Sequence, residues 1–197
     1  AIDQPHDAFV VECTSFRLAW TRDFRAEAAA WLNLAPDHLN WHASMGTYET
    51  AKARIWAGQH ADDAAIAFTG APDVMRRLRD APGRRVTFGQ GGDYHLDGTR
   101  LVGPAGTITT TDTMRRSLPH DITNALAASA MVLEAGLAAA REIAAFDFAA
   151  VTFYDADQRK HSIRRALGEG AEAFSGLSYQ DNTSLTAMAI KNRHYLP

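Results

Sequence analysis

Three separated positions in the sequence carry side chains that can take part in binding a metal ion. Glu12 ends the apolar run 7–13, which we predict to be a buried strand. His38 follows a second apolar run, 28–34, and Lys52 lies in the middle of a predicted helix. In open α/β sheets, ligands bind at the carboxyl ends of the strands. One interpretation of Glu12 is therefore a magnesium ligand in a nucleotide-binding fold.

Each of these residues also has an ordinary structural interpretation. A carboxylate at a strand exit, such as Glu12, commonly accepts hydrogen bonds from a neighbouring loop. A single loop histidine such as His38 is usually solvated or caps a turn. Lys52 on an amphipathic helix is by default a solvated charge. Taken one at a time, the three residues do not distinguish a metal-binding site from ordinary solvated or capping side chains.

The elements that must position these residues alternate between strands and helices. Ser44 is a suitable N-cap for a helix that extends to Gly58, because apolar side chains recur there at helical spacing. A helix at 72–79 lies between two short apolar runs typical of strands, 64–69 and 85–88. This alternation predicts an α/β domain with a largely parallel sheet.

After Phe88 the sequence becomes more polar. Residues 93–113 predict a small antiparallel excursion with a hairpin turn at Asp97-Gly98. The remaining pattern predicts helices at 121–137, 139–148 and 183–191, and strands at 161–166 and 176–179.

Composition restricts the classes of partner. The 197 residues include 20 basic and 23 acidic side chains, a net charge of -3 that argues against a nucleic-acid surface. The longest apolar region, 124–151, contains four charged residues, so we expect no membrane span. Cys13 is the single cysteine and cannot form an internal disulfide, which favours a cytoplasmic protein.

Two further features have simple structural explanations. We expect Trp31, Trp41 and Trp56 to pack in the core and against helices rather than to form a stacking platform. The glycine-rich run 89–92 predicts a turn and not a phosphate loop, because no helix and no Lys-Ser or Lys-Thr pair follows it.

Several longer segments, in this order, together resemble the central domain of the Mur ligases. Among those enzymes the resemblance is to members that join D-glutamate to UDP-N-acetylmuramoyl-L-alanine. It is strong from 7 to 137 and weakens after about 148. The segments read VECTSFRL (11–18), WLNLAPDHLNWH (31–42), MGTYETAKARI (45–55), VTFG (86–89), GDYHL (92–96) and LPHDITNALA (118–127).

The resemblance implies a fold and a chemistry. The fold is a P-loop-like, mostly parallel sheet flanked by helices, with a small antiparallel excursion. The enzymes use ATP and Mg to phosphorylate a carboxylate, and an amine then displaces phosphate from the acyl phosphate. By resemblance, Glu12 binds the first magnesium, with Thr14 and Ser15 beside it. His38 and a carbamylated Lys52 serve the second, because carbamylation turns a cation into an anionic oxygen ligand.

Other positions match less well. Asn124 corresponds to the asparagine that contacts the adenine side of ATP, and Asp121, which stands where the family has an asparagine, is expected to bind the nucleotide as well. Asn182 replaces the family's aspartate, for which Asp181 could substitute by a shift of one residue, and both are expected to contact ATP. Ser184 replaces its lysine. The arginine of the family's His-Arg pair is also lost, since the best match is His161-Ser162. Fewer positively charged side chains therefore remain to bind the phosphates of ATP.

No Gly-Lys pair occurs in the chain, so the family's phosphate loop is missing from this sequence. We therefore expect a fragment without the phosphate-loop strand and helix. Residues 1–178 would form the central domain, and 179–197 would start a carboxy-terminal domain. As a ligase, it would act as a monomer on small-molecule substrates, without a nucleic-acid or membrane partner. A noncatalytic fragment or interaction module, and a superfamily member adding another amino acid, remain open.

Overall fold

The computed structural model describes residues 9–143, 148–155, 158–168, 171–174 and 176–180. The described strands form three sheets of three strands each. The first sheet is parallel, with the order β1 (Ala28–Trp31), β2 (Ala64–Phe68) and β3 (Arg84–Phe88). The predicted α/β fold class is therefore confirmed.

The helices begin and end where the local sequence provides caps. Ser44 caps α2 (Met45–Ala57) with a capping box, in which its hydroxyl accepts from the Thr47 N–H and Thr47 Oγ1 accepts from the Ser44 N–H. Pro72 opens α3 (Pro72–Leu78) at a position where its missing N–H costs nothing. The other α-helices are α1 (Ser15–Trp20) and α4 (Pro119–Ile143).

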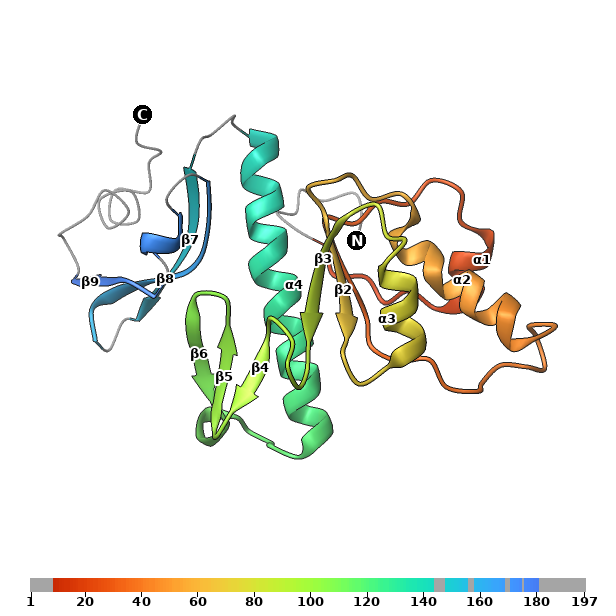
Figure 1. Ribbon diagram of the computed structural model, residues 1–197, viewed down its shortest axis with the longest axis horizontal. Helices are drawn as coiled ribbons and strands as arrows, with labels where there is room; N and C mark the ends of the chain where they lie inside the picture. The colour runs from red at the N-terminus through yellow and green to blue at the C-terminus, as the bar shows by residue number, and fades with distance from the viewer. Residues whose placement is uncertain (1–8, 144–147, 156–157, 169–170, 175, 181–197) are drawn as a thin grey trace.

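Helices cover both faces of the parallel sheet (Figure 1). On one face, α4 packs against all three strands and buries Leu126, Ala130 and Leu133 against Ile66 and Val86. On the other face, α2 and α3 cover a second core cluster. Its buried members are Ala29, Trp31, Trp56, Ala65, Ala67, Val74 and Leu78. Successive residues of each strand point to opposite faces, so the apolar run of β2 fills both clusters.

The antiparallel excursion predicted at 93–113 is confirmed. Its strands are β4 (His95–Asp97), β5 (Arg100–Gly103) and β6 (Gly106–Thr110), followed by the 3₁₀ turn η1 (Thr111–Thr113). Gly98 has a φ of 59°, as the predicted hairpin turn requires of a glycine.

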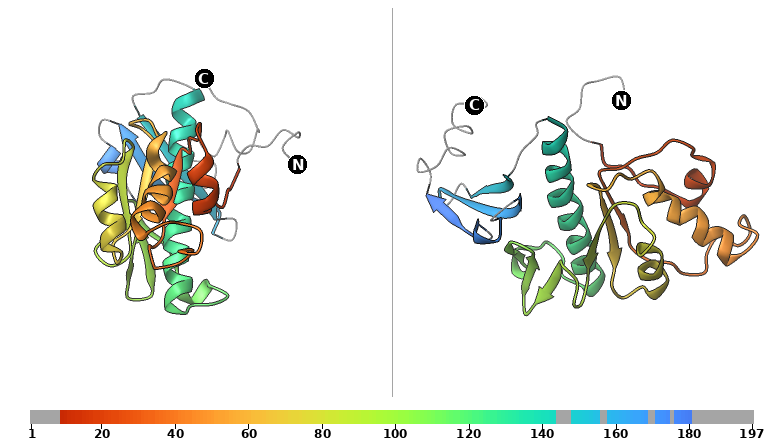
Figure 2. Two further views of the ribbon diagram at one scale, coloured as in Figure 1. Left: turned by 90° about the vertical axis from the view of Figure 1, so that its right-hand side faces the viewer. Right: turned by 45° about the horizontal axis from the view of Figure 1, so that its top comes forward.

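The carboxy-terminal part forms a third sheet, which is antiparallel. It contains β7 (Phe148–Asp155), β8 (Lys160–Gly168) and β9 (Ser178–Gln180), with the 3₁₀ turn η2 (Ala171–Phe174) between the last two. Figures 1 and 2 show α4 between this sheet and the parallel sheet, and α4 contacts strands of both.

The helix predicted at 121–137 is confirmed, since it lies within α4. The break predicted before a second helix at 139–148 is wrong, because α4 continues without interruption to Ile143. Residue 148 instead begins β7, which the sequence did not indicate. Alanine-rich sequence favours a helix locally, but pairing with β8 along the whole strand outweighs that preference. The helix predicted at 183–191 lies outside the described residues.

The strand predicted at 7–13 is also wrong over its described part, 9–13. This segment forms no strand pairing, and the side chains of Phe9, Val10 and Val11 are exposed. A strand requires a hydrogen-bonded neighbour, which an apolar run alone does not supply. Among the described residues, β1 pairs only with β2, so its other edge has no strand beside it.

Charged groups at the amino ends of the parallel strands are buried and paired. Asp63, just before β2, is 1% exposed and accepts from Arg25 Nε and Nη2, each at 2.9 Å. Glu134 of α4 is also 1% exposed and accepts from Arg84 Nη2 at 2.6 Å and from the Tyr94 hydroxyl at 2.7 Å. These bonds fasten the strand starts to each other and to α4.

None of the described helices combines the length and the apolar character that crossing a membrane requires.

Candidate functional site

The loop from β1 to α2 brings His38 to the carboxyl end of the parallel sheet. His38 has a φ of 55°, a left-handed conformation that is uncommon for a residue other than glycine. Its N–H donates to Asp37 Oδ1 at 2.7 Å, and its Nε2 lies 3.3 Å from Asp37 Oδ2. Both side chains are exposed. A carboxylate and an imidazole are therefore held together and open to solvent.

Helix α2 presents Tyr48 and Lys52 on one face, because residues four apart are neighbours on a helix. The Lys52 Nζ atom lies 5.4 Å from the centre of the Tyr48 ring, and that ring lies 6.2 Å from the His38 ring. Burial lowers the pKa of Lys52 below its ordinary value, and the Asp37 carboxylate partly opposes this shift. The structure thus brings Lys52 next to the Asp37-His38 pair.

Thr14 and Ser15 begin helix α1. The Thr14 side chain caps this helix by accepting from the Arg17 N–H at 3.3 Å. Ser15 is buried, and its Oγ lies 3.0 Å from His42 Nε2. Glu12 is exposed in the extended segment that precedes the cap. Both hydroxyls therefore have structural partners, and their predicted place beside a metal stays a prediction.

Asp121 and Asn124 lie in the first turns of α4. Asp121 Oδ2 accepts from the Leu118 N–H at 3.2 Å and lies 3.6 Å from Arg116 Nε. This capping interaction explains an aspartate at the start of the helix, where negative charge is favourable. Asn124 is exposed. The start of α4 lies at the same end of the molecule as the carboxyl ends of β2 and β3 (Figure 1).

The remaining predicted ligands, Asp181 and Asn182, lie outside the described residues. Within the described part of the chain, no three His, Cys, Asp or Glu side chains gather closely enough to hold a metal ion. A carbamylated Lys52 would supply a ligand that is not a His, Cys, Asp or Glu side chain. A cation site that uses it therefore needs fewer side chains of those four types.

Sequence reasoning did not assign a role to three residues near His38. Asp37 contacts His38 directly, Tyr48 lies between His38 and Lys52, and His42 is buried beneath them. The spacing of two histidines four residues apart was the available signal for His42. Trp41 does not reach the core, since its side chain is 47% exposed, but it packs against helix α1, where it meets the Phe16 ring edge-on at 5.0 Å. Trp31 is buried as predicted.

The sequence model of the Mur ligase middle domain matches residues 1–132. The chain belongs to this family. A UDP-N-acetylmuramoylalanine--D-glutamate ligase of Frankia casuarinae is 37% identical over 151 residues, which are 70% of this chain and 31% of that protein. The ligase of the same name from Mycolicibacterium vanbaalenii is 32% identical over 196 residues, 94% of this chain and 37% of that protein.

The chain thus spans about a third of the length of these curated relatives. A crystal structure of MurF from Acinetobacter baumannii is also similar, with a TM-score of 0.45 and 19% identity over 70% of this chain and 33% of that one.

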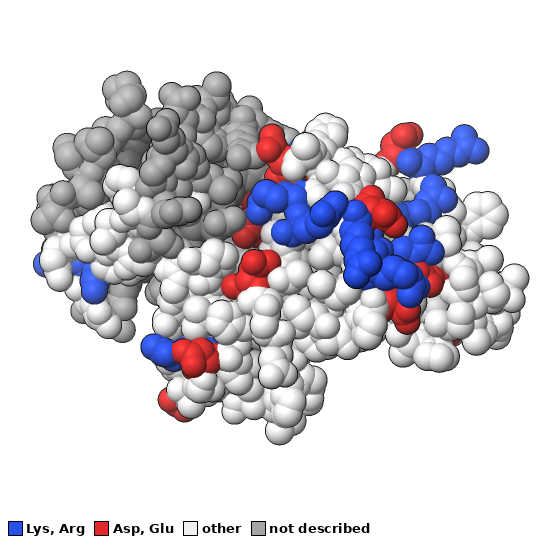
Figure 3. Space-filling view, viewed as in Figure 1, with Lys and Arg blue, Asp and Glu red and all other residues white. Residues whose placement is uncertain are grey.

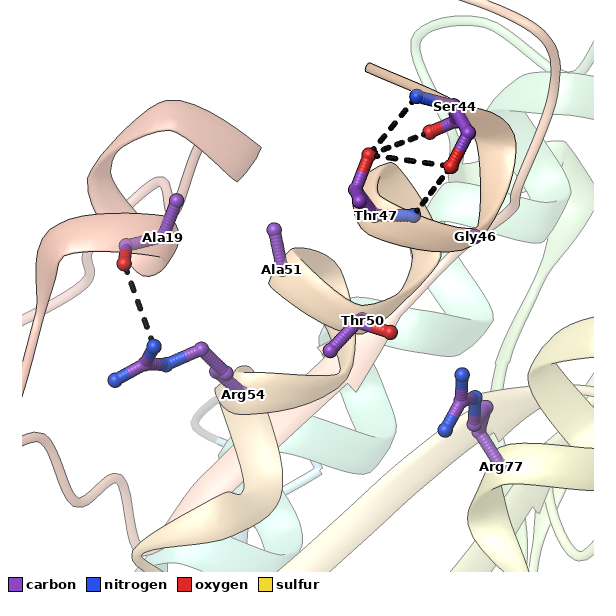
Figure 4. A pocket seen from close by; sticks show the side chains of 8 residues that line it. All are labelled: Ala19, Ser44, Gly46, Thr47, Thr50, Ala51, Arg54 and Arg77. Atoms are coloured by element: carbon purple, nitrogen blue, oxygen red, sulfur yellow. Dashed lines mark hydrogen bonds between the residues drawn. The ribbon is translucent and has the colours of Figure 1, made fainter. Parts of the chain in front are cut away.

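A separate pocket in this Mur ligase middle domain lies between α1, α2 and α3. It has a volume of about 520 Å³ and contains none of the predicted ligands. Figure 4 shows Arg54 extending from α2 to the Ala19 carbonyl, while Ser44 and Thr47 bond each other at the helix start. The lining is Ala19, Ser44, Gly46, Thr47, Thr50, Ala51, Arg54 and Arg77.

The arginines near this pocket are paired with acidic groups. Arg76 and Arg77 both donate to Glu49 Oε1, at 2.8 and 2.5 Å, and Arg76 also donates to Asp73 at 2.6 Å. Figure 3 shows acidic side chains among the basic ones on this side of the molecule. These bonds connect α3 to α2 and pair both of these arginines with carboxylates.

Proposed function

We propose that this chain is part of an ATP- and Mg-dependent ligase that joins D-glutamate to UDP-N-acetylmuramoyl-L-alanine. The observation that carries the proposal is the half-buried Lys52 beside Asp37 and His38 at the carboxyl end of a parallel sheet, in a Mur ligase middle domain. Two relatives that align with most of the chain carry the name of that ligase.

The reaction forms an amide from a carboxylate and an amine. A carboxylate oxygen takes the terminal phosphoryl group of ATP, and ADP leaves. The amine of D-glutamate then attacks the acyl carbon, loses a proton, and displaces inorganic phosphate. When bound, magnesium neutralises the charge on these polyanionic reactants. The residues of the chain would hold the cation and orient the carboxylate.

The side chains at the carboxyl end of β1 suit this task. The lowered pKa of Lys52 makes its neutral amine more available, and a neutral amine can add to carbon dioxide to give a carbamate. The exposed Glu12 carboxylate would provide a hard oxygen ligand for a first magnesium. A carbamate at Lys52, together with His38, would serve a second. A free ammonium at Lys52 would instead repel the cation.

The nucleotide would lie toward the start of α4. Asn124 is exposed there and has an amide that can both donate to and accept from an adenine ring. Asp121 is already engaged with the Leu118 N–H and Arg116, so we assign it a positioning role at this end of the helix. For the undescribed Asp181 and Asn182, contact with ATP is part of the same proposal.

The proposal also covers the setting of the reaction. We propose a monomer that acts in the cytoplasm on small molecules, without nucleic-acid or membrane partners. We propose a central domain in 1–178 and the start of a further domain in 179–197. Strand β9 (Ser178–Gln180) crosses that boundary and pairs with β8.

The test is an assay of the longest polypeptide encoded at the natural locus. We expect phosphate release that requires both UDP-N-acetylmuramoyl-L-alanine and D-glutamate, together with magnesium. Phosphate release that requires a different amino acid would show that the protein is a ligase of another branch of the family. An intact polypeptide that binds magnesium but releases no phosphate with any amino acid would favour a noncatalytic module of the same ancestry.

The 197 residues alone are expected to release no phosphate, because they lack a phosphate loop to stabilise the transition-state charge. The same assay on this chain checks that expectation. Substrate-dependent release by the short chain would show that the loop is dispensable.

A further inference from the structure

His42 connects the loop that carries His38 to helix α1. Its side chain is 4% exposed, and its Nε2 lies 3.0 Å from the Oγ of Ser15, which is 3% exposed. Ser15 is the first residue of α1 and lies three residues after Glu12. A single buried hydrogen bond thus joins two segments that are far apart in sequence and that both contain predicted cation ligands.

The backbone of His42 also fixes the conformation of His38. The N–H groups of Trp41 and His42 both donate to the His38 carbonyl, at 3.0 and 2.9 Å. This closes a tight turn in which His38 takes its positive φ. Such a conformation costs a non-glycine residue about 1–3 kcal/mol and persists only where the surroundings determine it. Burial of the His42 ring holds the turn closed.

Ring contacts extend the connection to Lys52. The His42 ring lies 5.7 Å from the Phe16 ring at an interplanar angle of 17°, and 5.1 Å from the Tyr48 ring. Tyr48 in turn faces both the His38 ring and the Lys52 Nζ atom. The buried His42 ring therefore contacts the Tyr48 side chain, which lies beside both predicted ligands.

An apolar core residue would not reproduce this arrangement. A leucine at position 42 could fill the volume, but it would leave the buried Ser15 hydroxyl without the imidazole partner. An unpaired buried polar group is costly, so α1 and the loop would shift relative to each other. The imidazole nitrogen therefore fixes α1 relative to the loop, which an apolar side chain of the same volume would not do.

We propose that His42 is a positioning residue that holds His38 and Lys52 at the separation at which they share a divalent cation. It acts through the Ser15 hydrogen bond, the turn at His38 and the Tyr48 ring. The proposal rests on the proposed function, because it assumes that His38 and Lys52 belong to one cation site.

The experiment uses the 197-residue chain with Mn²⁺ as the probe and bicarbonate present to supply carbon dioxide. Mn²⁺ favours the same oxygen ligands as Mg²⁺, and it broadens the NMR signals of nearby nuclei. Titrating Mn²⁺ while recording the ¹H–¹³C signals of the histidine rings gives a binding constant at His38. Urea unfolding measured on the same samples reports stability separately.

Three variants and one control separate position from packing. His42→Phe keeps an aromatic ring but loses the bond to Ser15, and we expect Mn²⁺ affinity at His38 to fall about 10–100-fold. His42→Gln, whose amide can still bond the Ser15 hydroxyl, should recover most of that affinity. Ser15→Ala removes the same bond from the other side. His60→Gln, an exposed histidine at the amino end of β2, should leave the affinity unchanged.

The outcomes distinguish the two proposals. No broadening of His38 in the wild-type chain would defeat the cation site, and the role of His42 with it. Equal Mn²⁺ affinity in wild type and a folded His42→Phe variant would overturn the role of His42 alone. If that variant does not fold, a folded Ser15→Ala variant decides, and unchanged affinity in it overturns the role. The role is supported if Ser15→Ala lowers the Mn²⁺ affinity and the double variant Ser15→Ala/His42→Gln lowers it no further.

Discussion

The two ends of the parallel sheet use charged residues in different ways. At the amino ends of the strands, Asp63 and Glu134 are buried, and each carboxylate is bonded to an arginine. At the carboxyl end, Asp37 and His38 are exposed, and Lys52 is half-buried beside the Tyr48 ring, where the Asp37 carboxylate only partly offsets its burial. Charges of the same kinds thus stabilise the fold at one end and stay accessible at the other.

This difference separates residues that matter for folding from residues that matter for binding. A buried carboxylate with its arginine cannot be altered without leaving a charge unpaired, so its effect appears in stability. An exposed group with few protein partners contributes little to stability and remains available to a ligand. Mutations at the two ends should therefore change different measured quantities.

The largest effect on stability is expected for Glu134→Ala. The substitution leaves Arg84 without its carboxylate in a buried setting and removes the acceptor of the Tyr94 hydroxyl. We expect the free energy of unfolding, measured by urea denaturation, to fall by about 3 kcal/mol or more. Glu134→Gln, which retains the shape and one acceptor, should lose less. If Glu134→Ala lowered the free energy of unfolding by no more than the loss of an exposed ion pair does, the two ends of the sheet would not differ in the way described.

Lys52→Ala tests the opposite end. In the longest encoded polypeptide we expect ligation to fall at least about 100-fold, while the free energy of unfolding changes by about 1 kcal/mol or less. Added short carboxylic acids should restore part of the rate by replacing the lost anionic oxygens. Arg85→Ala, an exposed change at the amino end, is the matched control and should keep the wild-type rate.

A wild-type rate in the folded Lys52→Ala variant would remove the metal role assigned to this lysine.

Acid should act on the amino end of the sheet. Burial alone would raise the pKa of Asp63, but the hydrogen bonds from Arg25 and from the His60 N–H, and the charge of Arg25, lower it overall. Its contribution to stability is therefore fully present above the unfolded pKa of about 3.9 and is lost as pH falls through the lower folded value. The difference between the urea midpoints of wild type and Asp63→Asn should therefore be smaller at pH 3 than at pH 7.

A constant difference between the two proteins at both pH values would mean that ionisation of Asp63 does not stabilise the sheet.

The smallest effect is expected for Asp73→Ala. Asp73 pairs with Arg76 on the exposed face of α3, where water and salt screen the charges. The urea midpoint should stay within the error of the wild-type measurement. A clear shift would show that surface pairs also hold the helices in place, and would weaken the contrast between the two ends.

The sequence predicts much of the fold where local signals suffice. The Ser44 cap, the proline at the start of α3 and the apolar runs of β2 and β3 act over a few residues, and the structure has each element at its predicted place. Strand β7 and the strand expected at 7–13 depended on partners elsewhere in the chain. One gains its partner in β8, and the other has none among the described residues.

The same distinction applies to the candidate site. His38 and Lys52 could be named from the family pattern, and the structure brings them together around Tyr48. The role inferred for His42 could not be predicted, because it depends on a left-handed turn and on packing against α1. Neither is encoded in the spacing of a few residues.

Helix α4 has a mechanical consequence for the whole molecule. Its 25 residues, Pro119–Ile143, extend for about 37 Å, and the helix contacts the strands of the parallel sheet as well as β7 and β8. A stiff rod of this length cannot tilt at one end alone. A ligand that displaced the first turn would therefore strain the packing of the carboxy-terminal sheet, and by linkage any change in that packing would alter the ligand's affinity equally.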